Sequence, residues 1–373
     1  MTASQIKIAD AYNIPSNGPE IGLGEELVSH VVHATDKHDI AVLKPSIDKM
    51  KINISGLGAI KHSDAENGYE YWKCVYGLAL DALKDNSYDN VKRARIARYK
   101  IGMAVDLPDD AGSFTMGLNP YKVTDPAATL EFNPSHFDLT SVPKIAAFWA
   151  GIAGDQISFP KLMWSATCSR IDIAFDLLNL RLADLIVHRE NLWKVTSFGS
   201  YGEGTETLRY YRNSGYLTNF AVKQVKKEKR ADVIVYDKRA EQMAHGLTPK
   251  FGGLEHTRIE FQVDRKGGKL RTLHSMKFPK KDWFFRRIVS EDAPFDLDRW
   301  RLFLDSARFR GYSGAEALLT PDERAQLPTK GNAAFPDDLL VEAMWEHWHD
   351  ALIRAHVVPL LAWANKEPKD FKF

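Results

Sequence analysis

The sequence predicts an α+β fold: a twisted, mainly antiparallel sheet with flanking helices and a helical C-terminal appendage. Two observations carry this prediction. Apolar and polar residues alternate along 169–177 and again along 257–263, with the period of two expected of half-buried strands. Along 67–84 and 337–365 the apolar residues recur at helical spacing instead, and Pro359 is placed to bend or end the second helix. We therefore expect a sheet with helices on one of its faces.

Turn chemistry and periodicity predict the remaining elements in order. Glycine and proline punctuate residues 1–38, which we expect to be an N-terminal extension with one short helix at 25–33. Turn sequences at 109–112 and at Asn119-Pro120 separate short apolar runs, which predicts antiparallel strands. The expected strands are 46–60, 99–105, 114–118 and 129–132, and the expected helices are 67–84, 142–154 and 180–188. After the extension, we expect a main domain over 39–290 and a helical region over 291–373.

The composition is that of an ordinary globular protein. Of the 373 residues, 44% are hydrophobic and 27% are charged, which is enough apolar material for one large or two modest domains. No run of eighteen apolar residues and no secretory leader pattern occurs, so we expect a cytoplasmic protein that does not enter a membrane. Cys74 and Cys168 lack the Cys-x-x-Cys spacing of a thiolate zinc site and suit a reducing compartment.

Positive charge is concentrated in residues 221–290. This segment holds 18 lysines and arginines against 8 acids, a formal charge of +10, whereas the whole chain has a formal charge of +1. Such an asymmetry is expected where one face follows a phosphate backbone. The cations that we expect to bind DNA are Lys226, Lys227, Lys229, Arg230, Lys280, Lys281, Arg286 and Arg287.

The second half of that set alternates with aromatic residues between 277 and 287. Cations beside aromatic rings suit single-stranded nucleic acid, where each base can stack on a ring. An amphipathic helix that buries Trp283 and Phe284 is the alternative interpretation of the same residues.

The segment Ser169–Asp176 places acids where an ordinary strand would carry neutral residues. Successive strand side chains point to opposite faces, so Ile171, Ile173 and Phe175 share one face while Asp172 and Asp176 share the other. At about 3.3 Å per residue the two carboxylates stand about 13 Å apart, too far to chelate one ion together. Either acid can join an acid from a neighbouring strand. The alternative is a strand whose polar face meets water.

Two later segments add polar groups to this pattern. Residues 258–260 repeat the sequence Arg-Ile-acid, with Arg258 and Glu260 on the polar face. Between the two acidic strands, 233–242 is an apolar strand that runs into a charged, helix-compatible segment and offers Tyr236 and Lys238 on one face. Three strands thereby present carboxylates, a tyrosine and a lysine.

In this order and spacing, these motifs resemble the replication initiation factor family. The motifs are Arg-Ile-Asp-Ile-Ala-Phe-Asp at 170–176, Tyr-Asp-Lys-Arg-Ala-Glu-Gln at 236–242 and Arg-Ile-Glu-Phe at 258–261, with similar features at 130–134 and 204–214. The family comprises rolling-circle replication initiators of plasmids and filamentous phages, together with related relaxases of conjugative elements. The resemblance covers about residues 125–265.

The resemblance implies a metal-dependent DNA strand transferase. Tyr236 would attack a phosphodiester of the origin to give a 5′-phosphotyrosine, which is later rejoined, and Lys238 would stabilise the phenolate because a free tyrosine has a pKa near 10. Asp172 and Glu260 would hold one Mg²⁺ or Mn²⁺, with Asp176 as a third ligand or a neighbouring group. Tyr210 and Tyr211 are rival nucleophiles, and a second subunit is another possible source.

Several functions and partners stay open at this point. The favoured function is a rolling-circle initiator, with origin DNA as double strand and exposed single strand, a host helicase and a second copy of the chain as expected partners. The alternatives are a conjugative relaxase, a metal-dependent nuclease that uses water, and a non-catalytic DNA-binding protein. His347-Trp348-His349 matches a His-hydrophobic-His metal motif, but it lies in a helical pattern, where residues i and i+2 diverge.

Overall fold

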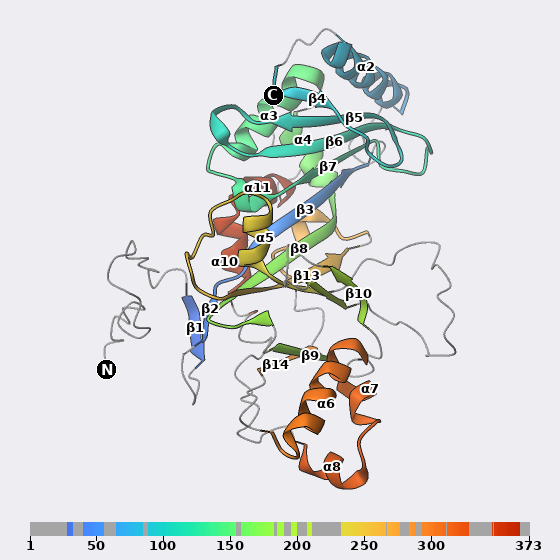
Figure 1. The fold of residues 1–373 in the computed structure, drawn as a ribbon. Helices are drawn as coiled ribbons and strands as arrows, with labels where there is room; N and C mark the ends of the chain where they lie inside the picture. Colours follow the sequence, from blue (N-terminus) through green and yellow to red (C-terminus); the bar gives the residue numbers. More distant parts are fainter. Residues whose placement is uncertain are drawn as a thin grey trace. The chain divides into compact units, whose positions relative to one another are not determined.

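The chain forms two compact units, each assembled from three segments (Figure 1). The first unit is Met1–Pro45, Ala174–Gln262 and Phe278–Trp348, and the second is Ser46–Ile173, Val263–Lys277 and His349–Phe373. The computed structural model describes residues 28–32, 40–55, 65–84, 89–153, 158–182, 185–189, 195–199, 207–210, 233–265, 267–276, 283–287, 293–310, 312–327, 345 and 347–365.

The second unit confirms the prediction of a mainly antiparallel sheet with flanking helices. Its strands follow the order β8–β3–β7–β6–β5–β4, and each neighbouring pair from β3 to β4 is antiparallel. The strands are β8 (Thr167–Leu178, of which residues to Ile173 belong here), β3 (Ser46–Ile54), β7 (Ala128–Phe132), β6 (Ser113–Pro120), β5 (Tyr99–Asp106) and β4 (Val91–Arg93).

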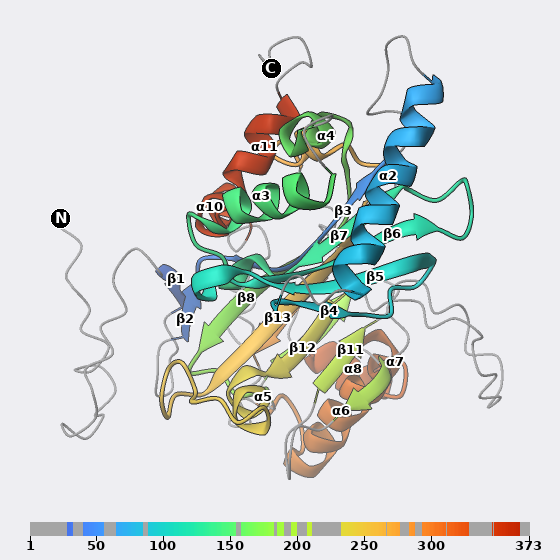
Figure 2. The same ribbon diagram turned by 90° about the horizontal axis from the view of Figure 1, so that it is seen from above.

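Helices cover one face of this sheet (Figure 2). They are α2 (Ala65–Lys84), α3 (Ser141–Ala153), α4 (Phe159–Ser165) and α11 (Val358–Asn365). Alternate residues of each strand point toward them, and Met50 and Ile52 of β3 are accordingly buried while Lys51 between them is half-buried. Aromatic rings join the helices: the ring centroid of Trp149 lies 6.0 Å from that of Trp72 and 5.9 Å from that of Phe159.

The first unit contains the strands that carry the family-like motifs. Their order is β10–β11–β12–β13–β8, with β2 also paired to β8 and β1 paired to β2. The bounds are β10 (Val195–Gly199), β11 (Thr207–Tyr210), β12 (Val233–Asp237), β13 (His256–Asp264), β2 (Ile40–Leu43) and β1 (Val28–Val32). Helix α5 (Lys238–Ala244) follows β12 directly, and β9 (Leu185–Arg189) pairs with β14 (Trp283–Arg287) in a second small sheet.

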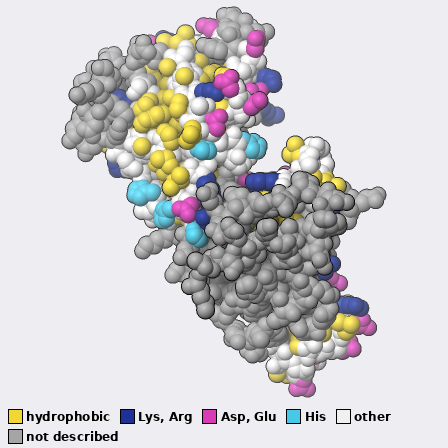
Figure 3. Space-filling view, turned by 90° about the vertical axis from the view of Figure 1, so that its left-hand side faces the viewer, with side chains coloured by type: hydrophobic (Ala, Val, Ile, Leu, Met, Phe, Trp, Pro, Cys, Tyr) yellow, Lys and Arg dark blue, Asp and Glu magenta, His cyan; other side chains and the backbone are white. Residues whose placement is uncertain are grey.

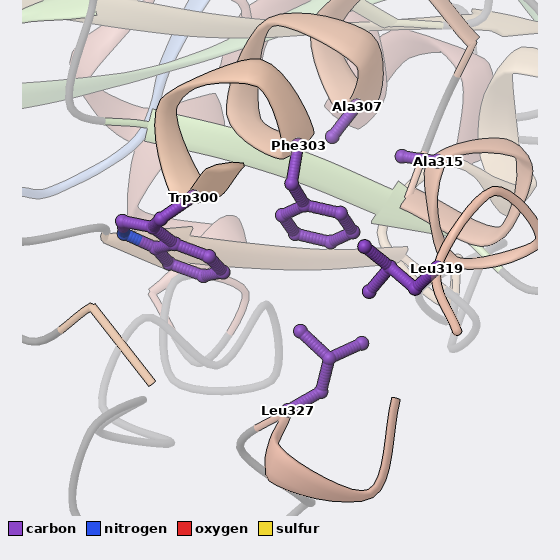
Figure 4. Packing of buried hydrophobic residues seen from close by; sticks show 6 residues of the cluster. All are labelled: Trp300, Phe303, Ala307, Ala315, Leu319 and Leu327. Atoms are coloured by element: carbon purple, nitrogen blue, oxygen red, sulfur yellow. The ribbon is translucent and has the colours of Figure 1, made fainter. Parts of the chain in front are cut away.

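A helical cluster in the first unit has a hydrophobic core of its own (Figure 4). Helices α6 (Leu297–Arg310), α7 (Tyr312–Glu316) and α8 (Pro321–Gln326) enclose Trp300, Phe303, Ala307, Ala315, Leu319 and Leu327. The rings of Trp300 and Phe303 are stacked at 5.2 Å. A capping box between Thr320 and Glu323 begins α8, and Glu323 also accepts a hydrogen bond from Nε of Arg299 at 2.8 Å.

Two predictions of secondary structure were wrong. The expected helix at 25–33 is the strand β1 in its described part, and the expected helix at 180–188 gives way to the strand β9. The aromatic and basic run up to Arg287 ends in the strand β14, so its described part does not form the amphipathic helix of the alternative interpretation. In each case a partner strand elsewhere in the chain decides the conformation, because strand pairing overrides local helix preference.

The helix expected over 337–365 is divided into two helices in its described part. Its described residues form α10 (Trp348–Arg354) and α11, because His356 takes a left-handed backbone conformation with φ of 52° and Pro359 lies in the first turn of α11. The predicted C-terminal region therefore contributes α6, α7 and α8 to the first unit and α11 to the second. Among the described helices, none has the length and apolar character needed to cross a membrane.

Candidate functional site

The three motif-bearing strands lie next to one another in the order β12–β13–β8. In the antiparallel register of β12 and β13, Tyr236 is opposite Arg258 and Ile234 is opposite Glu260. Side chains of directly opposite residues project from the same face of a sheet. The other face is apolar, since Val235 and Ile259, which are also opposite each other, are both fully buried. One face of this sheet therefore brings together the predicted tyrosine, an arginine and an acid.

Asp176 on β8 receives hydrogen bonds from two residues of β13. Nε and Nη2 of Arg258 donate to its two carboxylate oxygens at 2.7 and 2.8 Å, which is the bidentate geometry that suits an arginine and a carboxylate. Nε2 of His256 lies 2.8 Å from the same Oδ1 atom. The three side chains are almost fully enclosed, with exposed fractions of 12% for Asp176, 12% for Arg258 and 3% for His256. We call these three residues the Asp–Arg–His group.

Burial and pairing act in opposite directions on the Asp176 carboxyl. Burial alone would raise its pKa, but the Arg258 guanidinium and the His256 ring hold the pKa well below its usual range. Asp176 is therefore a permanent anion at neutral pH, and its charge is balanced by a protein cation.

Backbone contacts place Asp176 next to the start of β13. The amide of Asn179, just after β8, donates to the carbonyl of Glu255 at 2.8 Å, and Oγ1 of Thr257 donates to the carbonyl of Leu180 at 2.6 Å. Asn179 takes a left-handed backbone conformation, with φ of 62°, which suits an asparagine in a turn. The turn after β8 is thereby fixed to the strand that carries His256 and Arg258.

Tyr236 lies beside Lys238, as the sequence predicts, but the geometry differs from that of two residues on one strand. The strand ends at Asp237, whose carboxylate accepts a hydrogen bond from the amide of Ala240 at 2.9 Å and caps α5. The ammonium group of Lys238, in the first turn of that helix, lies 5.7 Å from the centre of the Tyr236 ring. Glu241, one turn further on, pairs with Lys238 at 2.7 Å.

The predicted metal ligands have protein partners in the structure. Asp172, which is 1% exposed and belongs to the second unit, pairs with Arg170 through a hydrogen bond of 2.6 Å from Nε and a second contact from Nη2. Glu260, in the first unit, accepts a hydrogen bond from Gln262 at 3.3 Å. Together with the contacts of Asp176, these pairs give each of the three predicted metal ligands a protein partner.

The described part of the chain contains no group of three His, Cys, Asp or Glu side chains placed to hold a metal ion. The binding of Mg²⁺ or Mn²⁺ stays a prediction. The His347-Trp348-His349 motif lies at the start of α10, as expected, and Nε2 of His349 contacts the carbonyl of His274.

Most of the predicted DNA-binding residues lie outside the described part of the structure. This holds for Lys226, Lys227, Lys229, Arg230, Lys280 and Lys281, and the rival nucleophile Tyr211 also lies outside it. The backbones of Arg286 and Arg287 belong to β14, and that of Tyr210 belongs to β11, where it pairs with Val233. On the face shown in Figure 3, described lysine and arginine side chains lie among acidic ones.

Sequence reasoning missed His256 and the pairing role of Arg258. The signal was available, because His256, Arg258 and Glu260 alternate along one strand and therefore share a face. This alternation does not predict that the side chains of His256 and Arg258 both contact Asp176, because that contact depends on β8 and β13 being neighbours in the sheet. Glu241 was also missed, although it stands three residues after Lys238 at helical spacing.

Comparison with known proteins adds no family to these findings. No protein-family model matches the chain, and no curated protein matches it.

Proposed function

We propose that the protein nicks one strand of DNA through Tyr236 and rejoins it, as a rolling-circle replication initiator or a relaxase of the same type. The observation that carries this proposal is the position of Tyr236: it projects from the sheet opposite Arg258 and against the ammonium group of Lys238. A phenol is a poor nucleophile at neutral pH unless nearby positive charge favours its ionised form. The ordered motifs at 170–176, 236–242 and 258–261 support the same proposal.

The reaction is a transfer of one phosphoryl group between two oxygens. Oη of Tyr236 forms a bond to the phosphorus atom as the bond between phosphorus and the 3′ oxygen breaks. The phenolic proton passes to water, and the 3′ oxygen takes up a proton. The phosphotyrosine keeps the energy of the phosphodiester, so the 3′ hydroxyl can later attack it and restore the strand. A tyrosine suits this outcome because attack by water would cut the strand permanently.

Lys238 and Glu241 have distinct parts in this scheme. The Lys238 ammonium favours the phenolate of Tyr236, and Glu241 holds Lys238 against the ring through their ion pair. When bound, Mg²⁺ or Mn²⁺ would neutralise the charge that develops on the phosphate oxygens, with Asp172 and Glu260 as the proposed ligands.

The proposed partners follow from the reaction. Origin DNA supplies the scissile phosphate as an exposed single strand, a host helicase would open the duplex beyond the nick, and a second copy of the chain would serve the second transfer. We place the reaction in the cytoplasm, where DNA of a plasmid, phage or conjugative element is found.

The proposal is tested with a supercoiled plasmid that carries the DNA flanking the gene of this chain. The expected products are nicked circles with the protein attached covalently to the 5′ end. Linear or nicked DNA with no attached protein would indicate a nuclease that uses water, and binding without cleavage would indicate a non-catalytic DNA-binding protein. A protection footprint on the same DNA then locates the binding site.

A further inference from the structure

A second concentration of positive charge lies in residues 91–100, which belong to the second unit and are distant in the sequence from 221–290. We call these ten residues the basic segment: they comprise β4, the start of β5 and the connection between them. The segment contains five exposed cations and no acid. The cations are Lys92, Arg93, Arg95, Arg98 and Lys100.

Close packing against the sheet holds the backbone of this segment in place. Gly102 of β5 and Gly117 of β6 are opposite each other, so they share a face of the sheet. A Cβ atom at Gly102 would collide with the carbonyl oxygen of Ala94, and one at Gly117 would lie 2.9 Å from Cγ2 of Ile96. The amide of Ala94 also donates to the carbonyl of Gly102 at 2.9 Å. Because the connection lies directly on these two glycines, its backbone is ordered before a ligand binds, which lowers the entropy cost of binding.

The positive charge of the basic segment is only partly balanced by carboxylates. Nζ of Lys92 lies 3.3 Å from a carboxylate oxygen of Asp106, and Nη1 of Arg98 lies 3.6 Å from one of Asp125. The cations without a carboxylate partner in the described part of the chain are Arg93, Arg95 and Lys100. Like charges confined to so short a segment repel one another, and a bound polyanion removes this repulsion.

Exposed apolar side chains lie at the same end of the sheet as these cations. Tyr99 pairs with Pro120, so the connection that follows β6 starts beside the basic segment. The amide of Tyr121 donates to the carbonyl of Arg98 at 2.9 Å. Tyr121 is 68% exposed and Val123 is 98% exposed. An exposed ring beside cations is the combination with which proteins stack unpaired bases and bind the phosphates between them.

We infer that the basic segment and Tyr121 form a binding surface for single-stranded nucleic acid, in addition to the predicted DNA-binding residues of 221–290. Arg93, Arg95 and Lys100 bind phosphates, and the Tyr121 ring stacks on a base. A duplex offers phosphates to such a surface but keeps its base faces covered, so only an unpaired strand uses both the charge and the ring. The inference goes beyond the proposed function, because binding a strand requires no cleavage.

The experiment measures binding of the whole chain to a fluorescent oligothymidylate of about 16 nucleotides over a range of salt concentrations. Each phosphate contact with a single strand contributes about 0.7 to the slope of log affinity against log salt. The combined variant Arg93→Gln, Arg95→Gln and Lys100→Gln should therefore lower this slope by about 2. Tyr121→Ala should weaken binding about 10-fold and leave the slope unchanged, because it removes a stacking ring and no charge. Affinity for a duplex of the same length should not respond to Tyr121→Ala.

A matched control removes three cations from other surfaces. Lys73, Lys84 and Arg301 are exposed, and each pairs with an acid three residues earlier on its own helix. Replacing all three by Gln lowers the charge of the chain by the same amount and should leave the slope unchanged. Removing like charges from the basic segment should not lower the melting temperature, and melting curves show that each variant is folded.

Every outcome of this assay supports or overturns the inference. An unchanged slope in the combined variant, or no binding of the wild-type protein to the oligothymidylate, overturns it. Equal losses for single strand and duplex, without an effect of Tyr121→Ala, assign the surface to duplex DNA and overturn the single-strand assignment. Binding to phosphatidylglycerol vesicles that the combined variant loses, with unchanged oligothymidylate binding, assigns the surface to anionic lipid. Because the assay measures binding alone, a failure to nick DNA through Tyr236 leaves its result unaffected.

Discussion

The ammonium group of Lys238 lies 5.7 Å from the centre of the Tyr236 ring, although the two residues belong to different elements. Asp237 ends the strand and caps the helix between them, and this turn brings the cation back over the ring. The end of β12, the capping residue Asp237 and the first turn of α5 are consecutive in the sequence, so one short segment fixes the surroundings of the proposed nucleophile.

Replacing Lys238 should reduce reactivity without unfolding the protein. Removing the positive charge over the Tyr236 ring should disfavour the phenolate, so Lys238→Gln should slow adduct formation at neutral pH about 10-fold or more. Lys238→Arg keeps the charge and should recover part of the rate. Lys250→Gln is a matched control, because the ammonium group of Lys250 lies 5.4 Å from the centre of the Phe251 ring. Equal rates for Lys238→Gln and the wild-type protein would remove Lys238 from the mechanism.

The metal prediction is tested most cleanly at Glu260. Glu260→Gln keeps the size of the side chain and its place on the polar face, so stability should change little while nicking is lost. Asp172→Asn is less informative, because it leaves the charge of Arg170 without its carboxylate in a buried position, at a cost of about 3–5 kcal/mol. Chelation with EDTA should stop nicking, and added Mg²⁺ or Mn²⁺ should restore it. Full activity in EDTA would contradict the prediction.

Asp176 should make stability depend on acid pH. Its pKa in the folded protein lies below the usual value of about 4, so the unfolded chain binds the proton more tightly. The stabilisation from the pair is complete above about pH 4 and decreases as the pH falls further. Melting temperatures measured through this range should fall less steeply for Asp176→Asn than for the wild-type protein.

The same variant gives a second readout at neutral pH. Asp176→Asn leaves Arg258 without its balancing charge and should lower the free energy of unfolding by about 3–5 kcal/mol at pH 7. Asp298→Asn is the control, because the Asp298 side chain is 87% exposed and pairs with Arg301 at the surface. Acid profiles that run parallel for Asp176→Asn and the wild-type protein would contradict this account of Asp176.

Local pattern was sufficient to predict the strands that carry the candidate site. Ile171, Ile173 and Phe175 are fully buried, as the alternation requires, because a strand with one apolar face has little freedom of register. The Arg-Ile-acid repeat likewise placed Arg258 and Glu260 on the face opposite the buried Ile259.

Features that depend on partners distant in the chain could not be predicted. Leu185 pairs with Arg287, and Val28 pairs with Leu43, so β9 and β1 are strands despite sequences that allow helices. The contact of Asp176 with Arg258 and His256 depends in the same way on β8 lying next to β13. The sequence shows which groups share a face of one strand, but the lateral order of strands decides which of them meet.

Peptide mapping of the DNA-linked protein tests the central claim most directly. The 5′-labelled adduct is formed on the nick-site oligonucleotide and digested with protease, and the labelled peptide is sequenced. We expect the label on the peptide that contains Tyr236, and no adduct from Tyr236→Phe, which removes a single oxygen and should leave DNA affinity and melting temperature nearly unchanged. A label on a peptide containing Tyr210 and Tyr211, or an adduct formed by Tyr236→Phe, would contradict the assignment.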